Sequence, residues 1–334
     1  MKTKQLFWIS IGLICLFATS CKQQTQSEPE PVLVIFDTDM GPDYDDVGAL
    51  AILHAFADKG EAKILATISS NKYTNSVPCI EIINRYFGRP DIPLGAPRNG
   101  VDMIDPRFER IYWPEILPLL YFHETKRSED APDAVSVYRK ILSNQPDSSV
   151  HIITVGFLTN LAALLQSPPD EFSDLDGTAL VKQKVKRLIS MAGRFPQGQE
   201  FNVCTDNDAS ILVFGQWPTP ITLSGFETGV EIITGKRLTT SDDIANSPVK
   251  DAFSMGMTID VDGRCSWDQT AVLVGVRGCG DYFDTVKGRM LVAPNCESTW
   301  EDDPDGTHEL LVWKMPKEEL TRIIEDLMMH QPKK

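Results

Sequence analysis

Short apolar runs alternate along the chain with longer segments of helical pattern. Residues 32–36 form an unbroken apolar run, which is typical of a strand buried on both faces of a sheet. An acidic turn follows, and residues 47–53 then carry the apolar start of a helix. Further strand-like runs stand at 62–68, 92–95, 150–155, 185–191 and 220–224, and helical patterns stand between them at 76–87, 134–142 and 206–216. This order predicts β-α-β units and a mostly parallel sheet.

The last third of the chain continues the pattern. Helical segments are predicted near 249–257 and at 270–276, strands at 285–292 and 309–314, and a final amphipathic helix at 316–329. We therefore expect an α/β fold with an open, mostly parallel, Rossmann-like sheet, helices on both faces, and one domain over 32–330.

Residues 97–131 interrupt this rhythm with three prolines and several aromatic residues. An irregular insertion of this length is typical of a lid or specificity loop, but surface packing explains the composition equally well.

The N-terminus carries an export signal. Lys2 and Lys4 precede an apolar run at 7–20 that is too short to span a bilayer, and small residues lead into Cys21. This pattern predicts a lipoprotein signal peptide with a lipobox at 1–21, followed by a polar linker at 22–31. The mature protein would then be exported and held to a bacterial membrane by a lipid on Cys21, and we expect it to face the periplasm. The alternative is an ordinary cleaved signal in which Cys21 is incidental.

Charge and cysteine content narrow the function. Loss of Lys2 and Lys4 with the signal leaves 30 of the 32 basic residues against 47 acidic ones, a formal charge of −17. Such a body is a poor partner for nucleic acid and for anionic membrane surfaces. Five cysteines remain outside the signal without a CxxC pair, so zinc and thiol redox chemistry lack support. Their odd number leaves at least one thiol free, and the sequence does not assign a pairing.

The candidate chemistry lies in the acidic turn after the first strand, where five aspartates stand within ten residues: Asp37, Asp39, Asp43, Asp45 and Asp46. Like charges at this density resist burial unless a cation compensates them. Calcium accepts six to eight oxygen ligands in irregular geometry, so we expect Ca²⁺ rather than Mg²⁺. The alternative is that one aspartate caps the following helix and the others are solvated.

Other polar residues follow the predicted strands, where ligands bind in open parallel sheets. They are Asn71, the turn at Val155-Gly156, Glu200 with Asn202, and Asp268 at a helix start. A cleft rich in acids and poor in arginine suits a neutral polyol bound through a metal, and suits a phosphate badly.

Four motifs in this order resemble the inosine-uridine preferring nucleoside hydrolase family. They are Asp37-x-Asp39 with Asp45-Asp46, the turn Val-Gly-Phe-Leu-Thr-Asn at 155–160, Glu200-Phe-Asn202, and Ser266-Trp-Asp268. The similarity covers about 32 to 314. It implies a nucleoside hydrolase fold and calcium-dependent hydrolysis of the N-glycosidic bond of a ribonucleoside or related riboside, giving ribose and free base. It also implies a possible homo-oligomer, and scavenging of nucleosides would suit an exported enzyme.

The resemblance assigns a role to each motif residue. Asp39, Asp46 and Asp268 would ligate calcium by side chain and Val155 by its carbonyl, with Asp37 orienting these ligands. Asp39 would also accept a proton from the attacking water. The sugar would be held by Asp45 and Asn202 at the 2′- and 3′-hydroxyls and by Asn71 and Glu200 at its other edges. Surrounding carboxylates would stabilise an oxocarbenium-like transition state.

Three positions depart from the family pattern. Five residues rather than three separate Asp39 from the aspartate pair, which we interpret as a two-residue insertion with Asp43 as a possible extra contact. Trp267 stands where nucleoside-cleaving members often carry a histidine that protonates the base, and an indole can stack on a base but cannot protonate it. Arg194 is nearest to the position of an asparagine ahead of Glu200. Purine, pyrimidine and other ribosides with better leaving groups therefore all stay open.

Two other functions compete with this interpretation. A catalytically silent, calcium-dependent ribose- or nucleoside-binding lipoprotein would keep the same sugar and metal residues. A haloacid-dehalogenase-like phosphatase would use Asp37 as nucleophile after the strand at 32–36. Among the histidines, His54 is expected to be packed in a helix, and His123 is the only candidate acid.

Overall fold

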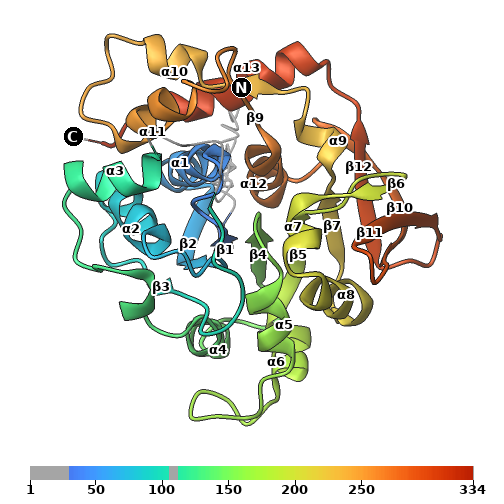
Figure 1. Cartoon of the computed structure of the whole chain (residues 1–334). Coiled ribbons are helices and arrows are strands. Elements are labelled where there is room, and N and C mark those ends of the chain that lie inside the picture. Colours follow the sequence, from blue (N-terminus) through green and yellow to red (C-terminus); the bar gives the residue numbers. More distant parts are fainter. Residues whose placement is uncertain (1–29, 105–111, 334) are drawn as a thin grey trace, which may run out of the picture.

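The computed structural model describes residues 30–104 and 112–333. The predicted signal peptide, most of the predicted linker and residues 105–111 of the insertion lie outside the described residues. The described chain is built around a ten-stranded sheet in the order β3-β2-β1-β4-β5-β7-β12-β10-β11-β6 (Figure 1). The predicted α/β class is confirmed.

Seven neighbouring strands run parallel, and three further strands form an antiparallel edge. The parallel strands are β3 (Leu94–Gly95), β2 (Ala62–Ser69), β1 (Val32–Thr38), β4 (Val150–Thr154), β5 (Val185–Met191), β7 (Ile221–Ser224) and β12 (His308–Trp313). The edge consists of β10 (Phe283–Val292), β11 (Glu297–Asp302) and β6 (Gln197–Gln199), and β8 (Ile233–Thr234) pairs separately with β9 (Arg264–Cys265).

Helices cover both faces of the sheet, as the sequence predicts (Figure 1). One face carries α1 (Asp45–Asp58), α2 (Ser76–Tyr86), α11 (Pro248–Gly256), α12 (Trp267–Arg277) and α13 (Lys317–Met328). The other carries α4 (Ala134–Ser143), α5 (Thr159–Leu165), α6 (Gly177–Lys184) and α8 (Asn207–Gln216). Shorter helices are α3 (Trp113–Leu120), α7 (Phe201–Thr205), α9 (Phe226–Gly229) and α10 (Lys236–Thr240).

Strand β1 is buried on both faces, as its apolar run predicts. Val34 and Phe36 belong to one apolar cluster and Ile35 to the other, and all three are fully buried. Alternate side chains of a strand point to opposite faces, so β1 needs apolar residues at every position.

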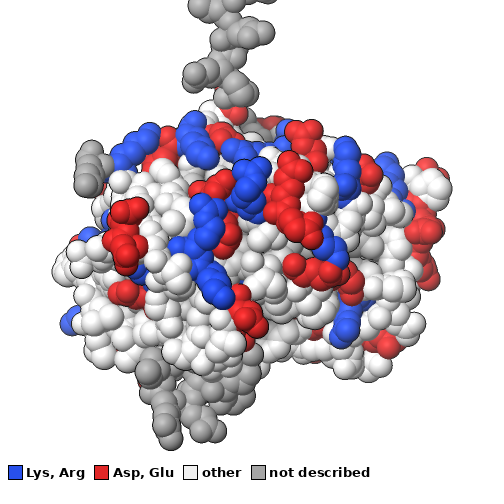
Figure 2. Space-filling model, turned by 90° about the horizontal axis from the view of Figure 1, so that it is seen from above, with Lys and Arg blue, Asp and Glu red and all other residues white. Residues whose placement is uncertain are grey.

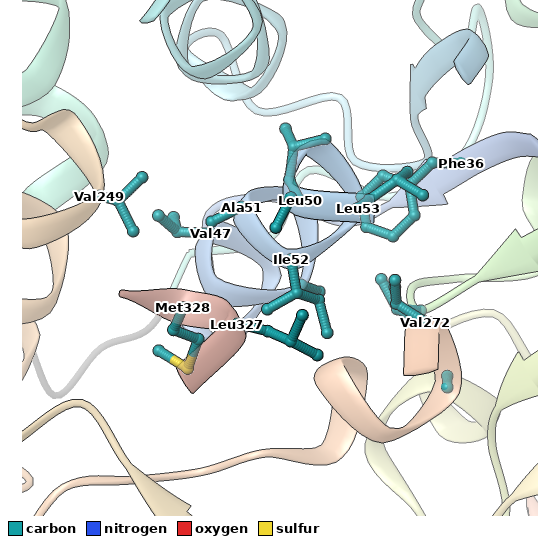
Figure 3. Close-up of a cluster of buried hydrophobic side chains, with 14 of the residues drawn as sticks. Phe36, Val47, Leu50, Ala51, Ile52, Leu53, Val249, Val272, Leu327 and Met328 are labelled. Atoms are coloured by element: carbon teal, nitrogen blue, oxygen red, sulfur yellow. The ribbon is translucent and has the colours of Figure 1, made fainter. Parts of the chain in front are cut away.

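Helix α1 is enclosed by its neighbours, which fixes the acidic turn at its start. Twelve of its fourteen residues are buried. In Figure 3, Leu53 lies beside Phe36 of β1 and Ile52 lies beside Leu327 of α13, and Val272 of α12 belongs to the same apolar cluster. A helix packed on several sides cannot shift without opening cavities, so the position of its first turn is set by the core.

Short elements are where the sequence-based expectations fall short. The insertion at 97–131 is not irregular throughout, because it contains α3 and a 3₁₀ turn at Ser128–Asp130. Strands β6, β8 and β9 have two or three residues each, too few to show a periodic pattern. Their pairing depends on partners distant in the sequence.

One disulfide joins Cys204 at the end of α7 to Cys296 in the turn between β10 and β11, with their Cα atoms 4.9 Å apart. Cys79, Cys265 and Cys279 are free, in agreement with the odd cysteine count. The bond ties the short helix α7 to the antiparallel edge of the sheet.

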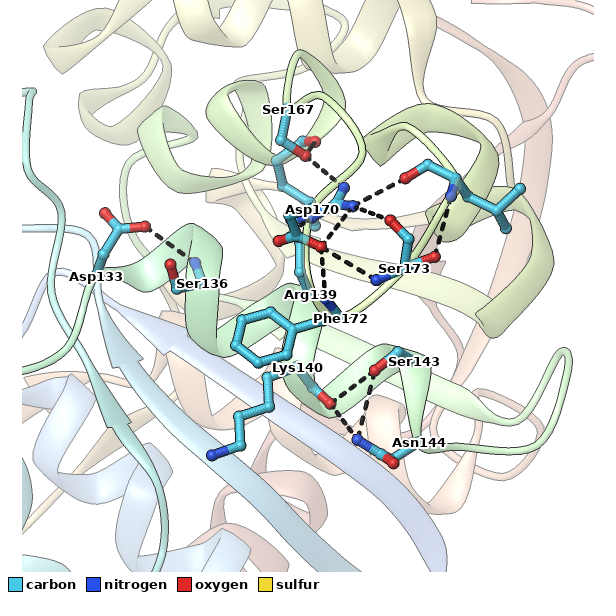
Figure 4. A network of polar contacts seen from close by, with 12 residues as sticks. Asp133, Ser136, Arg139, Lys140, Ser143, Asn144, Ser167, Asp170, Phe172 and Ser173 are labelled. Atoms are coloured by element: carbon cyan, nitrogen blue, oxygen red, sulfur yellow. Dashed lines mark hydrogen bonds and ion pairs between the residues drawn. The ribbon is translucent and has the colours of Figure 1, made fainter.

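The loop between α5 and α6 is anchored by Arg139 of α4, a buried arginine (Figure 4). Its guanidinium donates to both carboxylate oxygens of Asp170 at 2.7 and 3.0 Å, to Ser167 Oγ at 2.9 Å and to the carbonyls of Ser173 and Leu175. Since each contact satisfies a donor that burial has removed from water, this arginine is a structural anchor.

On the face shown in Figure 2, basic and acidic side chains are interspersed. Ion pairs of exposed side chains in the described chain include Arg237 with Asp326 at 2.7 Å, and Arg322 with the same aspartate at 3.4 Å. The face therefore presents no extended region of one sign among the described residues. In the described ranges, the chain also has no helix long and apolar enough to cross a membrane.

Candidate active site

A cavity of about 290 Å³ lies where the carboxyl ends of the parallel strands meet. Its walls are formed by Asp39, Asp43, Asp45, Val155, Met191, Gln199, Glu200, Phe201, Asn202, Phe226, Arg264, Trp267 and Asp268. Apart from Asp37, nine residues were predicted for the site, and seven of them line this cavity. Asp46 is buried behind the wall, and Asn71 does not line it.

Two helix starts bring the acids together. Asp45 and Asp46 lie in the first turn of α1, and Asp268 lies in the first turn of α12. These two helices pack side by side on the same face of the sheet (Figure 1). The N-terminal end of a helix carries a partial positive charge, which favours carboxylates there.

Asp37 is fully buried beneath the cavity. One of its oxygens accepts hydrogen bonds from the Tyr138 hydroxyl at 2.8 Å and from Asn160 Nδ2 at 3.0 Å. Burial raises the pKa of Asp37 to about 7, although both hydrogen bonds act to lower it. A carboxyl group enclosed in this way cannot attack a substrate, so the structure argues against the phosphatase alternative.

Asp46 has the clearest unsatisfied group. One oxygen accepts a hydrogen bond from the Thr38 hydroxyl, while Oδ2 is buried and has no hydrogen-bond partner among the described residues. Burial, and after it the charges of Asp39 and Asp43, raises the pKa of Asp46 well above its ordinary value. A buried carboxylate oxygen without a donor is costly unless a cation binds it.

Asp39 and Asp268 share this electrostatic environment. Burial is the largest cause raising both pKa values, followed by the charge of Asp43 for Asp39 and that of Asp45 for Asp268. In the described ranges, no three His, Cys, Asp or Glu side chains form a closed ligand cluster. The unsatisfied oxygen of Asp46 and the crowded oxygen donors around it nevertheless fit a hard divalent cation.

The turn after β4 supplies a backbone oxygen to the same place. The Val155 carbonyl accepts a hydrogen bond from Asn202 Nδ2 at 3.1 Å, and the Val155 N–H donates to the Asp37 carbonyl at 2.8 Å. Gly156 follows, and a Cβ there would lie 2.4 Å from the Asp39 nitrogen. Only glycine therefore allows this turn to approach Asp39 so closely.

Glu200 and Asn202 are positioned by the start of α7. The Glu200 carboxylate caps the helix by accepting N–H groups from Asn202 at 2.8 Å and Val203 at 3.1 Å, and it also accepts from Gly193 at 3.2 Å. Burial raises the pKa of Glu200, while these N–H donors lower it. The Asn202 amide donates to the Met191 carbonyl at 3.2 Å as well, which links α7 to the end of β5.

Asn71 is used inside the protein. Its Nδ2 donates to the carbonyls of Asp39 at 3.1 Å and Met103 at 2.9 Å, and its Oδ1 accepts from the N–H groups of Tyr73 and Met103. The side chain is fully buried and holds the turn after β2 against Asp39. Its expected contact with the sugar stays a prediction.

Arg264 on β9 is a cavity residue that the sequence analysis did not single out. The guanidinium is buried and donates from Nε to Asp45 at 3.0 Å, and it also pairs with Asp43 and, at 3.5 Å, with Asp260. It lies over the ring of Trp267, 5.0 Å from the ring centroid. The cleft, which was expected to be rich in acids and poor in arginine, thus contains one arginine among the described wall residues. A two-residue strand 219 positions from Asp45 gives no local signal of this contact.

Part of the cavity wall is aromatic. Trp267 and Phe226 have ring centroids 5.3 Å apart and tilted by 35°, and Trp267 Nε1 donates to the Phe226 carbonyl at 2.9 Å. Phe201, which also lines the cavity, is 47 % exposed. Arg194 is not among the residues that line the cavity. Its guanidinium lies over the Phe226 ring, 4.8 Å from the centroid, and its side chain is about half exposed.

The histidines lie elsewhere. None of the five is in the cavity wall, and the expectation that His54 is packed is confirmed, because it is fully buried against Asn84 of α2 at 2.9 Å. His123 Nδ1 faces the Tyr121 carbonyl at 3.0 Å. Sequence reasoning had kept His123 open as an acid, but the structure does not bring it to the cavity.

Comparison with solved structures identifies the fold class of this chain. A plant nucleoside hydrolase, PpNRh1, aligns with 89% of this chain and 99% of its own at a TM-score of 0.64 and 20% identity. An inosine-uridine preferring nucleoside hydrolase from Bacillus anthracis aligns over 89% and 99% at a TM-score of 0.67 and 15% identity. The fold is thus the nucleoside hydrolase fold.

The sequence comparison narrows the class to one family. The model of the family described as inosine-uridine preferring nucleoside hydrolase matches residues 34–299, so this chain belongs to that metal-dependent family. The non-specific ribonucleoside hydrolase RihC of Salmonella typhi is 27% identical over 188 residues, and the corresponding protein of Salmonella paratyphi B is 27% identical over 183. The matched region covers 54% of this chain and 56% of each relative, so the chain spans little more than half the length of these relatives.

Proposed function

We propose that this protein hydrolyses the N-glycosidic bond of a ribonucleoside or related riboside and releases ribose and the free base, with calcium as its metal. The observation that carries the proposal is that Asp39, Asp45 and Asp268 line one cavity, while an oxygen of the neighbouring Asp46 is buried without a hydrogen-bond partner among the described residues. Family membership and the names of the ribonucleoside hydrolase relatives support it.

The residues that would hold calcium all offer oxygen. They are the carboxylates of Asp39, Asp46 and Asp268 and the carbonyl of Val155, with Asp37 below them as the group that orients the loop. Irregular sets of carboxylate and carbonyl oxygens suit calcium better than magnesium, which requires near-octahedral geometry. When bound, the cation supplies positive charge that makes a neighbouring water more acidic.

The side chains of the cavity perform the remaining steps. Asp39 accepts a proton from the water that attacks the anomeric carbon. Asp45 and Asn202 bind the 2′- and 3′-hydroxyls of the ribose, and Glu200 binds a further sugar edge. As the bond to the base breaks, positive charge grows on the sugar, and the surrounding carboxylates stabilise it.

Ribose release by the purified protein tests this function. We would supply purine, pyrimidine and pyridine ribosides with calcium or with chelator, and compare the wild type with Asp39→Asn. Release that requires calcium and is lost in the variant is the expected result. Release that persists in Asp39→Asn or in chelator would contradict the assignment. Asp303→Asn, at a partly exposed aspartate that pairs with Arg289 and does not line the cavity, is the matched control.

The second candidate is a catalytically silent, calcium-dependent ribose- or nucleoside-binding protein. The observation in its favour is that the indole N–H of Trp267 is bonded to the Phe226 carbonyl, so no histidine-like acid stands at the start of α12. Calcium-dependent binding of ribose or nucleoside without release from any riboside would decide for this alternative.

We also propose that the protein is exported and anchored by a lipid on Cys21, facing the periplasm. The Cys204–Cys296 disulfide supports this location, since such bonds persist in oxidising compartments. Labelling with a fatty-acid analogue tests the anchor, and loss of label in Cys21→Ser is expected. Self-association, expected from the family resemblance, is a separate proposal that light scattering would test.

A further inference from the structure

The cavity has a strong excess of negative charge on its walls. Five of its wall residues are acids, namely Asp39, Asp43, Asp45, Glu200 and Asp268, and Arg264 is the only cationic side chain among the wall residues that the structure describes. The guanidinium of Arg264 is already paired with Asp43 and Asp45. Even with a divalent cation bound, an anion that developed in this cavity would meet a negative surface.

The described wall also offers no group to protonate a departing base. It contains no His, Lys, Tyr or Cys, and the only indole N–H, that of Trp267, is bonded to the Phe226 carbonyl. Three of the five acids are engaged as acceptors, because Arg264 donates to Asp43 and Asp45, and three backbone N–H groups donate to Glu200. The other two, Asp39 and Asp268, are the carboxylates assigned above to the cation. Ordinary purines and pyrimidines leave as anions unless they are protonated, so such a departure is unfavourable here.

The aromatic wall favours a flat cation. Phe226 and Trp267 each already carry a guanidinium over the ring, Arg194 at 4.8 Å and Arg264 at 5.0 Å from the respective centroids. These contacts show that both rings already take part in cation–π interactions. Stacking of a cation on an aromatic face contributes about 0.5–2 kcal/mol, and the nearby carboxylates add to that attraction.

Resting on the function proposed above, we propose that this site is specialised for ribosides whose aromatic base carries a fixed positive charge, such as N-ribosylpyridinium compounds or N7-alkylated purine ribosides. When the bond between C1′ and the ring nitrogen breaks, its electron pair passes to the base and cancels that charge. The base leaves neutral and needs no proton. The water oxygen forms the new bond to C1′, and its proton passes to Asp39 and then to solvent.

A matched pair of substrates tests this specificity with the unmodified protein. Inosine and 7-methylinosine differ by one methyl group and one positive charge, and each enzymatic rate would be divided by the spontaneous rate of the same compound. General acid catalysis contributes about 100-fold or more to a rate, so we expect the enhancement for 7-methylinosine to exceed that for inosine by about 100-fold. Nicotinamide riboside against uridine provides a second comparison with the same expectation.

Equal enhancements for the charged and neutral members would overturn the inference while leaving the hydrolase function intact. Cleavage of no riboside at all would overturn both, so the two failures are distinguishable.

A variant pair tests the structural cause. Trp267→His restores a possible proton donor at the start of α12, and it should raise the ratio of inosine to 7-methylinosine turnover by about 10-fold or more. Trp267→Phe keeps an aromatic ring without a transferable proton and should give no such rise. An unchanged ratio in a folded Trp267→His protein that still binds calcium would contradict the stated cause.

Discussion

At the scale of single residues, Arg264 is the side chain on which the geometry of the sugar site depends. It is buried, it contacts Asp43 and Asp45 through one guanidinium, and its plane lies against Trp267. Asp45 has a pKa raised to about 7 by burial first and by Asp43 second, and Arg264 opposes both effects. Arg264 is therefore a positioning residue that opposes the rise in the pKa of Asp45 and holds its carboxyl group in place for the sugar hydroxyls.

Replacement of Arg264 should affect binding and stability together. Arg264→Met leaves the buried carboxylate of Asp45 and the partly exposed carboxylate of Asp43 without their partner, and breaking a buried ion pair costs about 3–5 kcal/mol. We expect a lower free energy of unfolding and a KM for riboside raised by about 10-fold or more, with partial rescue in Arg264→Lys. Urea titration and steady-state kinetics would measure both. A wild-type KM in Arg264→Met would show that Asp45 does not need this contact.

At the scale of elements, the cavity is assembled from helix starts that are held by distant parts of the chain. Helix α7 has only five residues, and it is fixed by the Glu200 cap and by the Cys204–Cys296 disulfide. A helix of this length has little stability of its own. The position of Asn202 therefore depends on a covalent bond to the antiparallel edge.

Removal of the disulfide should loosen this helix. A disulfide that closes a loop of 92 residues contributes about 4–5 kcal/mol in the chain-entropy description, with about 2–4 kcal/mol typical of measurement. We expect the Cys204→Ser, Cys296→Ser double variant to lose stability in that range and to bind sugar more weakly. Cys279→Ser, at a half-buried free cysteine, is the matched control. Equal stability of the double variant and the control would contradict the expectation.

At the contact between α1 and α2, the buried His54 beside Asn84 predicts that the stability of the protein depends on pH. Burial lowers the pKa of His54 from 6.5 to about 3, so the folded protein binds fewer protons at this site than the unfolded chain. Stability is then lost as pH falls below about 6.5, and the loss continues until about pH 3. By linkage, the loss between pH 7 and 4.5 is roughly 2 kcal/mol.

Replacing His54 with a group that does not titrate separates this effect from others. His54→Gln should be less stable at pH 7, because the contact with Asn84 changes, yet it should show a shallower decline between pH 7 and 4.5. Urea unfolding at several pH values measures the slope. An identical slope in the variant would assign the decline to other groups.

At the scale of the whole molecule, the sheet brings six acidic side chains from three segments together at the carboxyl ends of its parallel strands. The arrangement is electrostatically unfavourable without a cation, since Asp39, Asp46 and Asp268 all have pKa values raised by burial and by the charges of neighbouring acids. Calcium should therefore stabilise the entire fold, because it binds the folded chain and not the unfolded one.

Thermal unfolding measures this coupling. A ligand at 100 times its Kd adds about 2.7 kcal/mol, which for a domain of this size raises Tm by about 5 °C. We expect calcium to do so, magnesium to give a smaller rise, and Asp46→Asn to reduce the calcium effect. A calcium effect that is unchanged in Asp46→Asn would place the cation elsewhere.

The sequence by itself determined the parallel sheet and most of the residues of the site. Buried parallel strands have apolar residues at every position, so 32–36 and 185–191 were recognisable, and the acids stand in the motifs that follow such strands. Tertiary structure alone decided which groups complete the cavity. Arg264 reaches Asp45 across 219 positions, and Cys204 pairs with Cys296 across 92. Local patterns report which face of an element is buried, whereas contacts of this kind depend on how distant elements pack.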